Sequence, residues 1–380
     1  MISLAPRRVL VAPDKFKGTL SSAQAARAIV RGLRTVWPQT RFTTLAIADG
    51  GEGFTRTLTR ALGGTLRRVW TSDALGRPCV AHWALLRDRQ TAVLDLATAS
   101  GLAQVPTTQR DPRKTSTLGT GRVLAHALRS GATTVIIGLG GSATNDGGIG
   151  LAAAMDWRFL DRHGKPIPLT GAGLLRLHHL EPPLVPPHGR IIGAVDVTNP
   201  LCGRLGAAQV FAPQKGAGPA AVQTLDAGLR RLAEVVERTT GCDAARAPGA
   251  GAAGGAGFGL VAFFGATLEP GFELLRRYLQ IDAVIRDHDL VVTGEGRYDS
   301  TSRRGKAPFR LAERCAELGR PVWGVFGCIQ PRMTRRPFAR VAAALGSETP
   351  EPLEAARAVH ERRLAAAAAR LARESLQRRA

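Results

Sequence analysis

Hydrophobic residues along the chain follow two periods that alternate with one another. A β-branched run over 8–14 ends in Pro and Asp, and residues 22–36 then carry apolar side chains at helical spacing. Ser21 and Gln24 have the spacing of a capping box, which predicts a helix that begins directly after Ser21. The stretch 43–63 repeats this plan, with an acidic glycine turn between its strand and its helix. These patterns predict the strand–loop–helix units of a parallel sheet.

The pattern changes over 65–105, where short alternating runs separated by turn residues predict antiparallel strands of a second domain. Strand and helix patterns of the first kind return at 115–138 and after 218, whereas 157–215 is rich in proline and holds one clear strand, RIIGAVD. The sequence therefore predicts an α/β fold, in which a Rossmann-like doubly wound parallel sheet domain is interrupted by a second, mixed α/β domain. The expected parts of the Rossmann-like domain are 1–65, 112–156 and 218–380, and those of the inserted domain are 66–111 and 157–217.

Composition excludes several classes of protein. The 380 residues carry a formal net charge of +22, but the basic residues are spread along the whole chain, so we expect no nucleic-acid partner. An apolar run long enough to cross a membrane is absent, and the N-terminal apolar run is too short for a signal peptide, so we expect a cytoplasmic protein without a membrane partner. Five scattered cysteines without a C-x-x-C pair indicate neither a disulfide framework nor a zinc site.

Lysine is rare in this arginine-rich chain. Only six of the 52 basic residues are lysine, and four of these six lie in glycine-rich or acidic motifs. A lysine is a compact point charge suited to phosphate, whereas arginine is a planar fork. The retained lysines are therefore candidates for contact with phosphate or carboxylate groups.

Polar and charged residues follow each expected strand, at the carboxyl ends where open parallel sheets bind ligands. They are Asp14, Lys15 and Lys17; Asp49 and Glu52; Ser142, Thr144, Asn145 and Asp146; Asp196 and Asn199; and Glu295, Arg297 and Asp299. Asp and Gly are also ordinary turn residues, so one such loop indicates little. Five of them together indicate a binding site.

The loop that follows the strand at 134–138 has the G-x-G-x-x-A spacing of a dinucleotide-binding turn. In such a turn the helix begins at the second glycine, which would put Gly147 and Gly148 in its first two turns at a cost of about 2 kcal/mol. We therefore expect the helix to start near Ile149. The loop before it then offers amides and hydroxyls to phosphate or carboxylate oxygens, with Asp146 available to a metal.

A second glycine-rich stretch, 249–259, also contains G-x-G-x-x-G, but a proline and not a strand precedes it. A phosphate-binding turn and a helix start packed closely on its neighbour explain it equally well.

Six stretches carry a family resemblance when they are taken in order. They are APDKFKGTLSSAQAA, ADGGEGF, GLGGSATNDGGIGLAAAM, DVTNPLCGRLGAAQVFAPQKGA, GAAGGAGFGLVAFFGA and DLVVTGEGRYDSTSRRGKAP. Together they resemble the glycerate kinases of the class II bacterial type, over nearly the whole chain. The resemblance implies transfer of the ATP γ-phosphate to D-glycerate with Mg²⁺, at the 2-hydroxyl to give 2-phosphoglycerate, by a monomer or homodimer.

The resemblance also implies roles for the strand-end residues. Asp196, at the end of the buried strand RIIGAVD and opposite the glycine-rich loops, is expected to accept the hydroxyl proton, with Glu295 as the next candidate. A turn-capping role for Asp196 before Pro200 is the alternative. Lys17 is the second expected catalytic residue. The expected substrate ligands are Asp14, Ser142, Asn145, Asn199, Lys215, Glu295 and Arg297; the expected nucleotide or phosphate ligands are Gly140, Gly141, Thr144, Gly254, Gly255 and Lys306; and the expected metal ligands are Asp146 and Asp49.

The chain departs from the family pattern at Lys15, at Thr198 and at the pair Arg303 and Arg304. Two other classes remain open from the residues. A hydroxy-acid dehydrogenase would hold NAD in the loop after 138, but neither of the nearest histidines, His126 and His163, lies in a strand-end turn. A nucleic-acid-binding function would be supported by the net charge alone.

Overall fold

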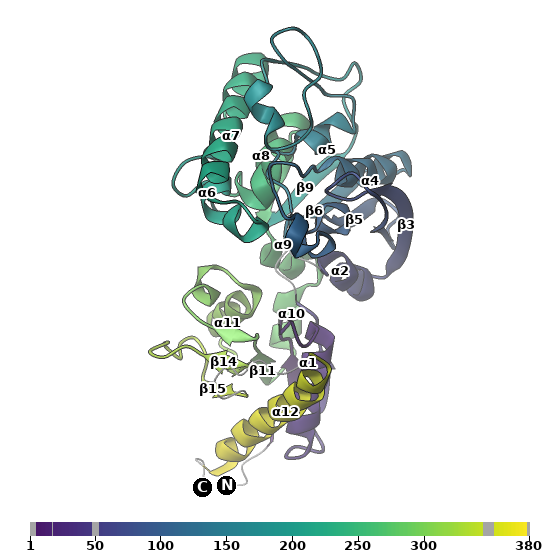
Figure 1. The fold of residues 1–380 in the computed structure, drawn as a ribbon. Helices are drawn as coiled ribbons and strands as arrows, with labels where there is room; N and C mark the ends of the chain where they lie inside the picture. Colours follow the sequence, from purple (N-terminus) through teal and green to yellow (C-terminus); the bar gives the residue numbers. More distant parts are fainter. Residues whose placement is uncertain (1–4, 17, 48–52, 345–352, 378–380) are drawn as a thin grey trace. The chain divides into compact units, whose positions relative to one another are not determined.

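The protein is described here by a computed structural model, which covers residues 5–16, 18–47, 53–344 and 353–377. The chain forms two compact units. The first unit combines Met1–Ala48 with Leu275–Ala380, and the second unit is Asp49–Leu274. In Figure 1 the purple beginning and the yellow-green end of the chain share the first unit, and the blue to green middle forms the second.

The first unit is built on a parallel sheet of five strands in the order β15-β13-β11-β1-β2. The strands are β1 (Arg8–Val11), β2 (Arg41–Thr44), β11 (Leu290–Thr293), β13 (Val322–Phe326) and β15 (Arg340–Ala343). The strand order reverses between β1 and β11, because the chain adds β2 on one side and β13 and β15 on the other. This is the doubly wound arrangement predicted from the sequence, and sheets of this kind bind ligands at the reversal point.

The helices of the first unit are α1 (Ser22–Arg34), α10 (Ile281–Arg286), α11 (Ala307–Glu317) and α12 (Leu353–Gln377), and α9 (Gly271–Tyr278) crosses the boundary between the units. A short ladder pairs β12 (Arg297–Tyr298) with β14 (Cys328–Ile329). The predicted capping box is confirmed, since the Ser21 side chain accepts from the Gln24 amide and the Gln24 side chain accepts from the Ser21 amide. Helices α1 and α12 approach so closely that a Cβ on Gly32 would lie 2.0 Å from the Ala365 carbonyl oxygen.

The second unit holds a sheet of six strands in the order β10-β9-β6-β5-β4-β3. The strands are β3 (Gly64–Ser72), β4 (Pro78–Leu86), β5 (Thr91–Asp95), β6 (Thr134–Gly138), β9 (Arg190–Val195) and β10 (Thr267–Pro270). Strands β10, β9, β6 and β5 run parallel to one another. Strand β4 is antiparallel to β5, and β3 is antiparallel to β4. A separate hairpin pairs β7 (Arg158–Leu160) with β8 (His179–Glu181).

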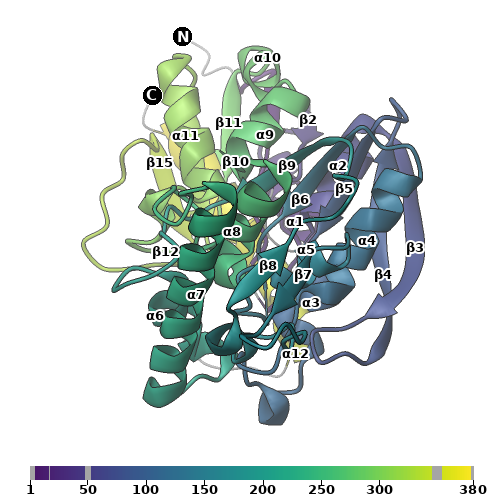
Figure 2. The ribbon, with the colours of Figure 1, turned by 90° about the horizontal axis from the view of Figure 1, so that it is seen from above.

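The helices of the second unit are α2 (Phe54–Leu62), α3 (Ala97–Ser100), α4 (Leu118–Arg129), α5 (Ile149–Ala153), α6 (Ala207–Phe211), α7 (Pro219–Thr240) and α8 (Ala252–Phe264). Side chains of α4, α5 and α8 share one hydrophobic core with β5, β6 and β9. Figure 2 shows these helices and strands from above. Short 3₁₀ turns occur at Leu102–Gln104, Thr107–Gln109, Gly173–Arg176, Pro213–Lys215 and Ser302–Arg304. Helix α5 begins at Ile149, as the glycines before it predicted, and RIIGAVD forms the buried strand β9.

The two units divide the chain differently from the five predicted segments. Residues 49–65, 112–156 and 218–274 were expected in the Rossmann-like domain, but they belong to the second unit with 66–111 and 157–217. The physical reason is strand pairing: β6 lies between β5 and β9 in the six-stranded sheet. The Rossmann-like sheet is therefore interrupted once, by a single continuous segment. The predicted α/β class with a doubly wound parallel sheet is confirmed.

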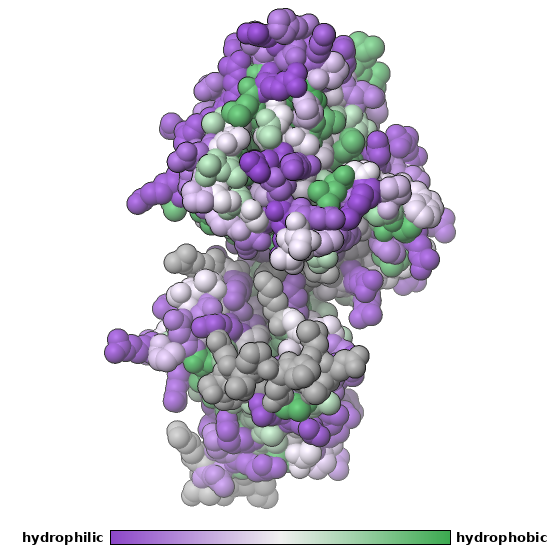
Figure 3. Space-filling model, in the orientation of Figure 1, coloured by the Kyte–Doolittle hydropathy of each residue, from purple (hydrophilic) through white to green (hydrophobic). Residues whose placement is uncertain are grey.

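Polar side chains cover most of the face shown in Figure 3, and hydrophobic ones form separate groups among them. Within the part of the chain that the structure describes, no helix has both the length and the apolar composition needed to cross a bilayer.

Candidate functional site

Two acidic residues follow the strands that flank the reversal point of the first unit. Asp14 follows β1 and Glu295 follows β11, and these strands are parallel neighbours with Val11 opposite Val292. The Asp14 amide donates to the Gly294 carbonyl at 2.8 Å, which joins the two strand ends. Both carboxyl groups are buried, with Asp14 at 7% and Glu295 at 5% exposure. The structure thus places two predicted substrate ligands at the edge where this type of sheet binds ligands.

Glu295 forms an ion pair with another predicted site residue. The Lys306 Nζ lies 2.6 Å from Glu295 Oε2, and Lys306 is the N-cap residue of α11. Burial raises the pKa of the Glu295 carboxyl, and Lys306 opposes this shift. Arg297 is exposed in β12, with its Nε 3.7 Å from Asp299. Lys17 lies outside the described residues.

Three consecutive strand ends carry the polar residues of the second unit. Strands β5, β6 and β9 are parallel neighbours, so their carboxyl ends lie at one edge of the sheet. Asp95 ends β5, the loop 139–148 follows β6, and the half-buried Asp196 follows β9. Asp196 was expected on the inserted domain, opposite the glycine-rich loops. It instead lies on the same sheet as the loop after β6, because Ala194 pairs with Gly138.

Lys215 is buried against the loop after β6. Its Nζ donates to Ser142 Oγ and to the Thr144 carbonyl oxygen, at 2.7 Å each, and the residue is 2% exposed. Burial lowers the pKa of Lys215 to about 7, and the nearby Asp146 opposes this shift. We call Ser142, Thr144, Asn145, Asp146 and Lys215 the Lys215 cluster.

Two members of the Lys215 cluster hold buried polar atoms without a partner. Thr144 Oγ1, Asn145 Oδ1 and Asn145 Nδ2 make no hydrogen bond within the described residues, and both residues are fully buried. Buried amides and hydroxyls in native proteins nearly always have partners, and an unpaired one costs about 1–3 kcal/mol. The cluster therefore offers a donor and acceptors to a ligand or to bound water.

Asp146 differs from the other members because its carboxylate is already satisfied. Its Oδ2 accepts from the Thr117 amide at 2.7 Å and from Thr117 Oγ1 at 2.8 Å, and its Oδ1 accepts from the Gly148 amide at 3.1 Å. Burial raises the pKa of this fully buried carboxyl. Mg²⁺ takes open oxygen ligands and keeps several waters, which this enclosed position does not fit. Asp146 ties the loop to the start of α4, and its expected metal role stays a prediction that this geometry does not favour.

The second expected metal ligand, Asp49, lies outside the described residues. Over 5–16, 18–47, 53–344 and 353–377, no three His, Cys, Asp or Glu side chains come together as a potential metal site.

Gly254 and Gly255 pack against the loop that carries the Lys215 cluster. A Cβ on Gly254 would lie 2.0 Å from the Thr144 carbonyl oxygen, and one on Gly255 would lie 2.8 Å from the Gly147 Cα. Both glycines have positive φ, and the Gly147 amide donates to the Gly254 carbonyl at 3.0 Å. This close backbone contact explains both glycines by packing, and their expected phosphate-binding role stays a prediction. Gly140 and Gly141, by contrast, are at least partly exposed after β6.

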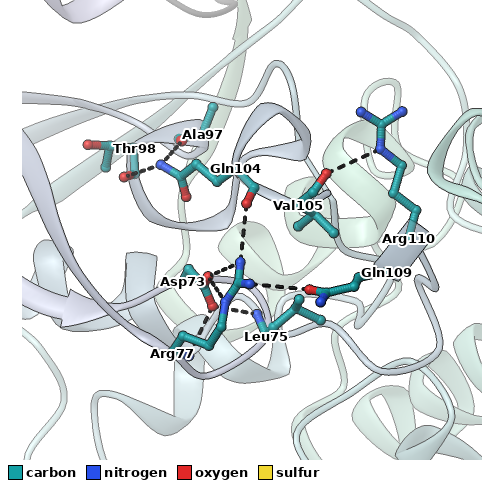
Figure 4. Close-up of polar contacts among 9 residues, drawn as sticks. All are labelled: Asp73, Leu75, Arg77, Ala97, Thr98, Gln104, Val105, Gln109 and Arg110. Atoms are coloured by element: carbon teal, nitrogen blue, oxygen red, sulfur yellow. Dashed lines mark hydrogen bonds and ion pairs between the residues drawn. The ribbon is translucent and has the colours of Figure 1, made fainter. Parts of the chain in front are cut away.

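A polar network next to this loop fixes the segment 97–110 (Figure 4). Arg77, in the turn between β3 and β4, binds Asp73 Oδ2 through Nε at 2.7 Å and donates to the Gln104 carbonyl and to Gln109 Oε1 at 3.2 Å each. Gln104 Nε2 in turn donates to the Thr98 carbonyl at 2.9 Å.

The segment held in this way supports the loop after β6 directly. The Leu102 amide donates to the Gly141 carbonyl at 2.7 Å, and the Ala143 amide donates to the Ser100 carbonyl at 2.8 Å. The loop backbone is thus fixed on both sides of Ser142, which preorganises the cluster for a ligand.

Comparison with known proteins decides the family. The sequence profile of the "Glycerate kinase family" matches residues 9–376. The chain belongs to this glycerate kinase family.

Two relatives and one solved structure agree with the profile. "Glycerate 2-kinase" of Escherichia coli (strain K12) is 41% identical over 325 residues, 85% of each chain. "Glycerate kinase" of Halalkalibacterium halodurans is 42% identical over 324 residues, 84% of this chain and 85% of the relative. A crystal structure described as a candidate glycerate kinase 2 from Salmonella typhimurium LT2 superposes with a TM-score of 0.84 at 38% identity, covering 97% of this chain and 98% of that one. The resemblance recognised in the six motifs is confirmed.

The residues predicted from the family motifs fall on both units. The first unit carries Asp14, Glu295, Arg297 and Lys306, and the second carries Gly140, Gly141, Ser142, Thr144, Asn145, Asp146, Asp196, Asn199, Lys215, Gly254 and Gly255. Asn199 is half-buried, and its Nδ2 donates to the Leu205 carbonyl at 2.8 Å.

Two polar residues near the strand ends of the second unit were not predicted from the sequence. Asp95 ends β5, and its carboxylate accepts from the Gly53 and Thr55 amides at 3.0 Å each, at the start of α2. The strand-end rule that found Asp196 could have found it. Thr117, which holds Asp146, lies in no motif, and only the folded chain brings it to the loop.

Proposed function

We propose that this protein transfers the γ-phosphoryl group of ATP to D-glycerate, at the 2-hydroxyl, to give 2-phosphoglycerate and ADP. The family match over residues 9–376 carries the proposal, and the name of the Escherichia coli relative supports the 2-position. The reaction uses cytoplasmic ATP, so we place the protein in that compartment. We propose a monomer or homodimer.

Phosphoryl transfer requires positioned cations and amides more than covalent chemistry by the protein. The Lys215 cluster supplies a preorganised set of such groups on the second unit. In our proposal Asn145 and Ser142 contact the substrate, and the amides of Gly140 and Gly141 contact phosphate oxygens. The unpaired amide of Asn145 supports this, because a ligand oxygen would satisfy a donor that the protein leaves unpaired.

Lys215 has two roles in this proposal. Its two hydrogen bonds to the loop fix Ser142 and Thr144, and its charge favours an anionic ligand beside them. A bound anion would stabilise the protonated amine that burial alone disfavours, so ligand binding and proton uptake by Lys215 should be coupled.

On the first unit, we propose that Asp14, Arg297 and Lys306 serve the substrate and the phosphates, together with Lys17. Their support is the reversal point of the doubly wound sheet, beside which Asp14 and Glu295 lie. The ion pair with Lys306 keeps Glu295 occupied, so Glu295 acts in our proposal as a partner for this cation and not as the base.

The 2-hydroxyl must lose its proton as its oxygen attacks the γ-phosphorus. The bond from that phosphorus to the β–γ bridging oxygen breaks, and ADP leaves. We propose that the Asp196 carboxylate takes the proton, because this half-buried residue ends β9 beside the loop after β6.

We propose that Mg²⁺ is required and enters with ATP as the counter-ion of its phosphates, which it would neutralise when bound. In this proposal the phosphates of ATP are the main ligands of the ion, because the Asp146 carboxylate is engaged by three hydrogen bonds.

Replacement of Asp196 tests the proposed mechanism. Asp196→Asn keeps the side-chain shape and removes the base, so kcat should fall about 10²-fold or more while ATP binding, measured calorimetrically, is retained. Asp243→Asn, an exposed carboxylate of the same unit, is the matched control and should keep normal kcat. A near-normal kcat in Asp196→Asn would remove this residue from the mechanism.

A further inference from the structure

The first unit has a cavity at the edge of its sheet opposite to Asp14 and Glu295. Its volume is about 310 Å³, and its lining includes Leu290, Pro321 and Ala339, at the amino ends of β11, β13 and β15. Asp14 and Glu295 follow the carboxyl ends of strands in the same parallel sheet. The cavity is therefore separate from the site residues of this unit.

Two tryptophans form an aromatic wall of this cavity. Trp37, which follows α1, and Trp323, in β13, have ring centroids 5.5 Å apart and ring planes inclined at 46°. The Arg340 guanidinium lies 5.7 Å from the Trp323 ring centroid. An apolar wall beside a stacked guanidinium suits a ligand with a flat apolar body and a negative group.

Two polar groups of the residues that line this cavity have no partner of opposite character among the described residues. The Trp37 indole N–H is buried, in a residue that is 2% exposed, and has no acceptor among the described residues. A buried indole N–H usually finds a hydrogen-bond partner. Arg340 makes no ion pair with any described residue, while Asp289, at the rim, already accepts from the Arg8 amide at 2.9 Å. The cavity lining thus holds a cation without an ion-pair partner and a tryptophan whose N–H lacks an acceptor, while the Asp289 carboxylate already binds the Arg8 amide.

We propose that this cavity is a second small-molecule site, which binds a planar organic carboxylate with an aromatic or conjugated body. The flat body packs on Trp323, the carboxylate pairs with Arg340, and a ligand oxygen accepts from the Trp37 indole. The volume is at the lower end of small-molecule sites, about 300–1,000 Å³, so the ligand is about the size of a single substituted ring. Glycerate is excluded as the ligand because every one of its carbons carries oxygen, which leaves the aromatic wall uncovered.

The tryptophans provide a direct test in the full-length protein. Benzoate is titrated into protein labelled with ¹⁵N at tryptophan, and the indole N–H resonances are followed by NMR. The Trp37 and Trp323 resonances should shift in a saturable way, with a Kd of about 1 mM or tighter. Those of Trp83 and Trp157, which belong to the second unit, should stay in place. Benzamide, the uncharged analogue, should bind about tenfold more weakly or not at all.

Variants of the residues that line the cavity test which side chains contact benzoate. Arg340→Gln should weaken benzoate binding about tenfold or more, and Arg373→Gln, which replaces an exposed arginine of α12, should leave it unchanged. Trp37→Phe keeps an aromatic wall, removes the N–H donor and should also weaken binding. Unchanged Trp83 and Trp157 resonances in each variant show that the second unit is folded, and a retained Trp323 resonance shows the same for the first.

Four results would overturn the proposal. One is the absence of saturable shifts at Trp37 and Trp323, and another is equal binding of benzoate and benzamide. Displacement of benzoate by ATP would identify the cavity as part of a nucleotide site. Binding that appears only after deletion of residues 1–4, which precede the lining residue Ala5, would show that the chain itself fills the cavity.

Discussion

Replacement of Lys215 by Met should abolish one defined part of the pH dependence of stability. Lys215 is buried, and its pKa is lowered from 10.5 to about 7 in the folded protein. Over this pH range the unfolded chain binds a proton that the folded chain releases, so the free energy of unfolding rises with pH. The full difference corresponds to about 5 kcal/mol, and the part between pH 7 and pH 9 to about 2 kcal/mol.

Methionine has a similar length and fills the same space without a titrating group. Its cost is the loss of the hydrogen bonds to Ser142 Oγ and the Thr144 carbonyl, about 1–3 kcal/mol for each acceptor left unpaired. Below pH 7 the gain from removing a buried charge offsets this cost, so Lys215→Met should be nearly as stable as the parent there. Above pH 7 the parent should become progressively more stable than the variant.

The assay is urea denaturation followed by circular dichroism, for parent and Lys215→Met, at pH 7, 8 and 9. All other titrating groups are shared, so their contributions cancel in the difference between the two free energies of unfolding. This difference should rise by about 2 kcal/mol in favour of the parent from pH 7 to pH 9. A difference that stays constant with pH would refute a lowered pKa for Lys215 and with it the buried position of its amine.

Three further substitutions test the surroundings of the site. Gly254→Ala should cost at least about 2 kcal/mol in urea denaturation, because its Cβ would meet the Thr144 carbonyl oxygen; Gly218→Ala has open space and should cost less, about 1 kcal/mol or below, because Gly218 is the N-cap residue of α7. Asp146→Asn should cost about 2 kcal/mol, unlike Asp243→Asn, since an amide cannot accept all three hydrogen bonds; equal stability of the two variants would contradict this role of Asp146. Lys306→Met should lower the melting temperature at pH 7, and by less as the pH falls, because the variant leaves the Glu295 carboxylate buried without its cation until it is protonated.

Local features of the fold followed from local chemistry. The capping box at Ser21 places the start of α1, and the two glycines before Ile149 exclude an earlier start of α5 because glycine is a poor helix former. The doubly wound sheet of the first unit follows from alternating strand and helix patterns. The domain division did not follow, because the pattern identifies β6 as a strand but does not identify β5 and β9 as its partners.

The sequence likewise predicted some positions of the candidate site but not the contacts between residues distant in the chain. Strand-end positions identified Asp14, Glu295 and Asp196, because the carboxyl edge of a parallel sheet gathers such residues. The role of Asp146 could not be predicted, since its three donors come from Thr117 and Gly148, and Thr117 is distant in sequence. The glycine-rich stretch around Gly254 matches a phosphate motif, yet close backbone packing also explains its glycines: Gly254 lies against the Thr144 carbonyl and Gly255 against the Gly147 Cα.

Phosphorus NMR of the product tests the proposed function most directly. The protein is incubated with ATP, Mg²⁺ and D-glycerate, and the proton-coupled ³¹P spectrum is recorded. Our account predicts ADP and a phosphomonoester resonance split by the single proton on C2, and both signals should be absent without glycerate. A resonance split by two protons would place the phosphate on the 3-hydroxyl, and ADP formation that does not depend on glycerate would contradict the assignment of the substrate.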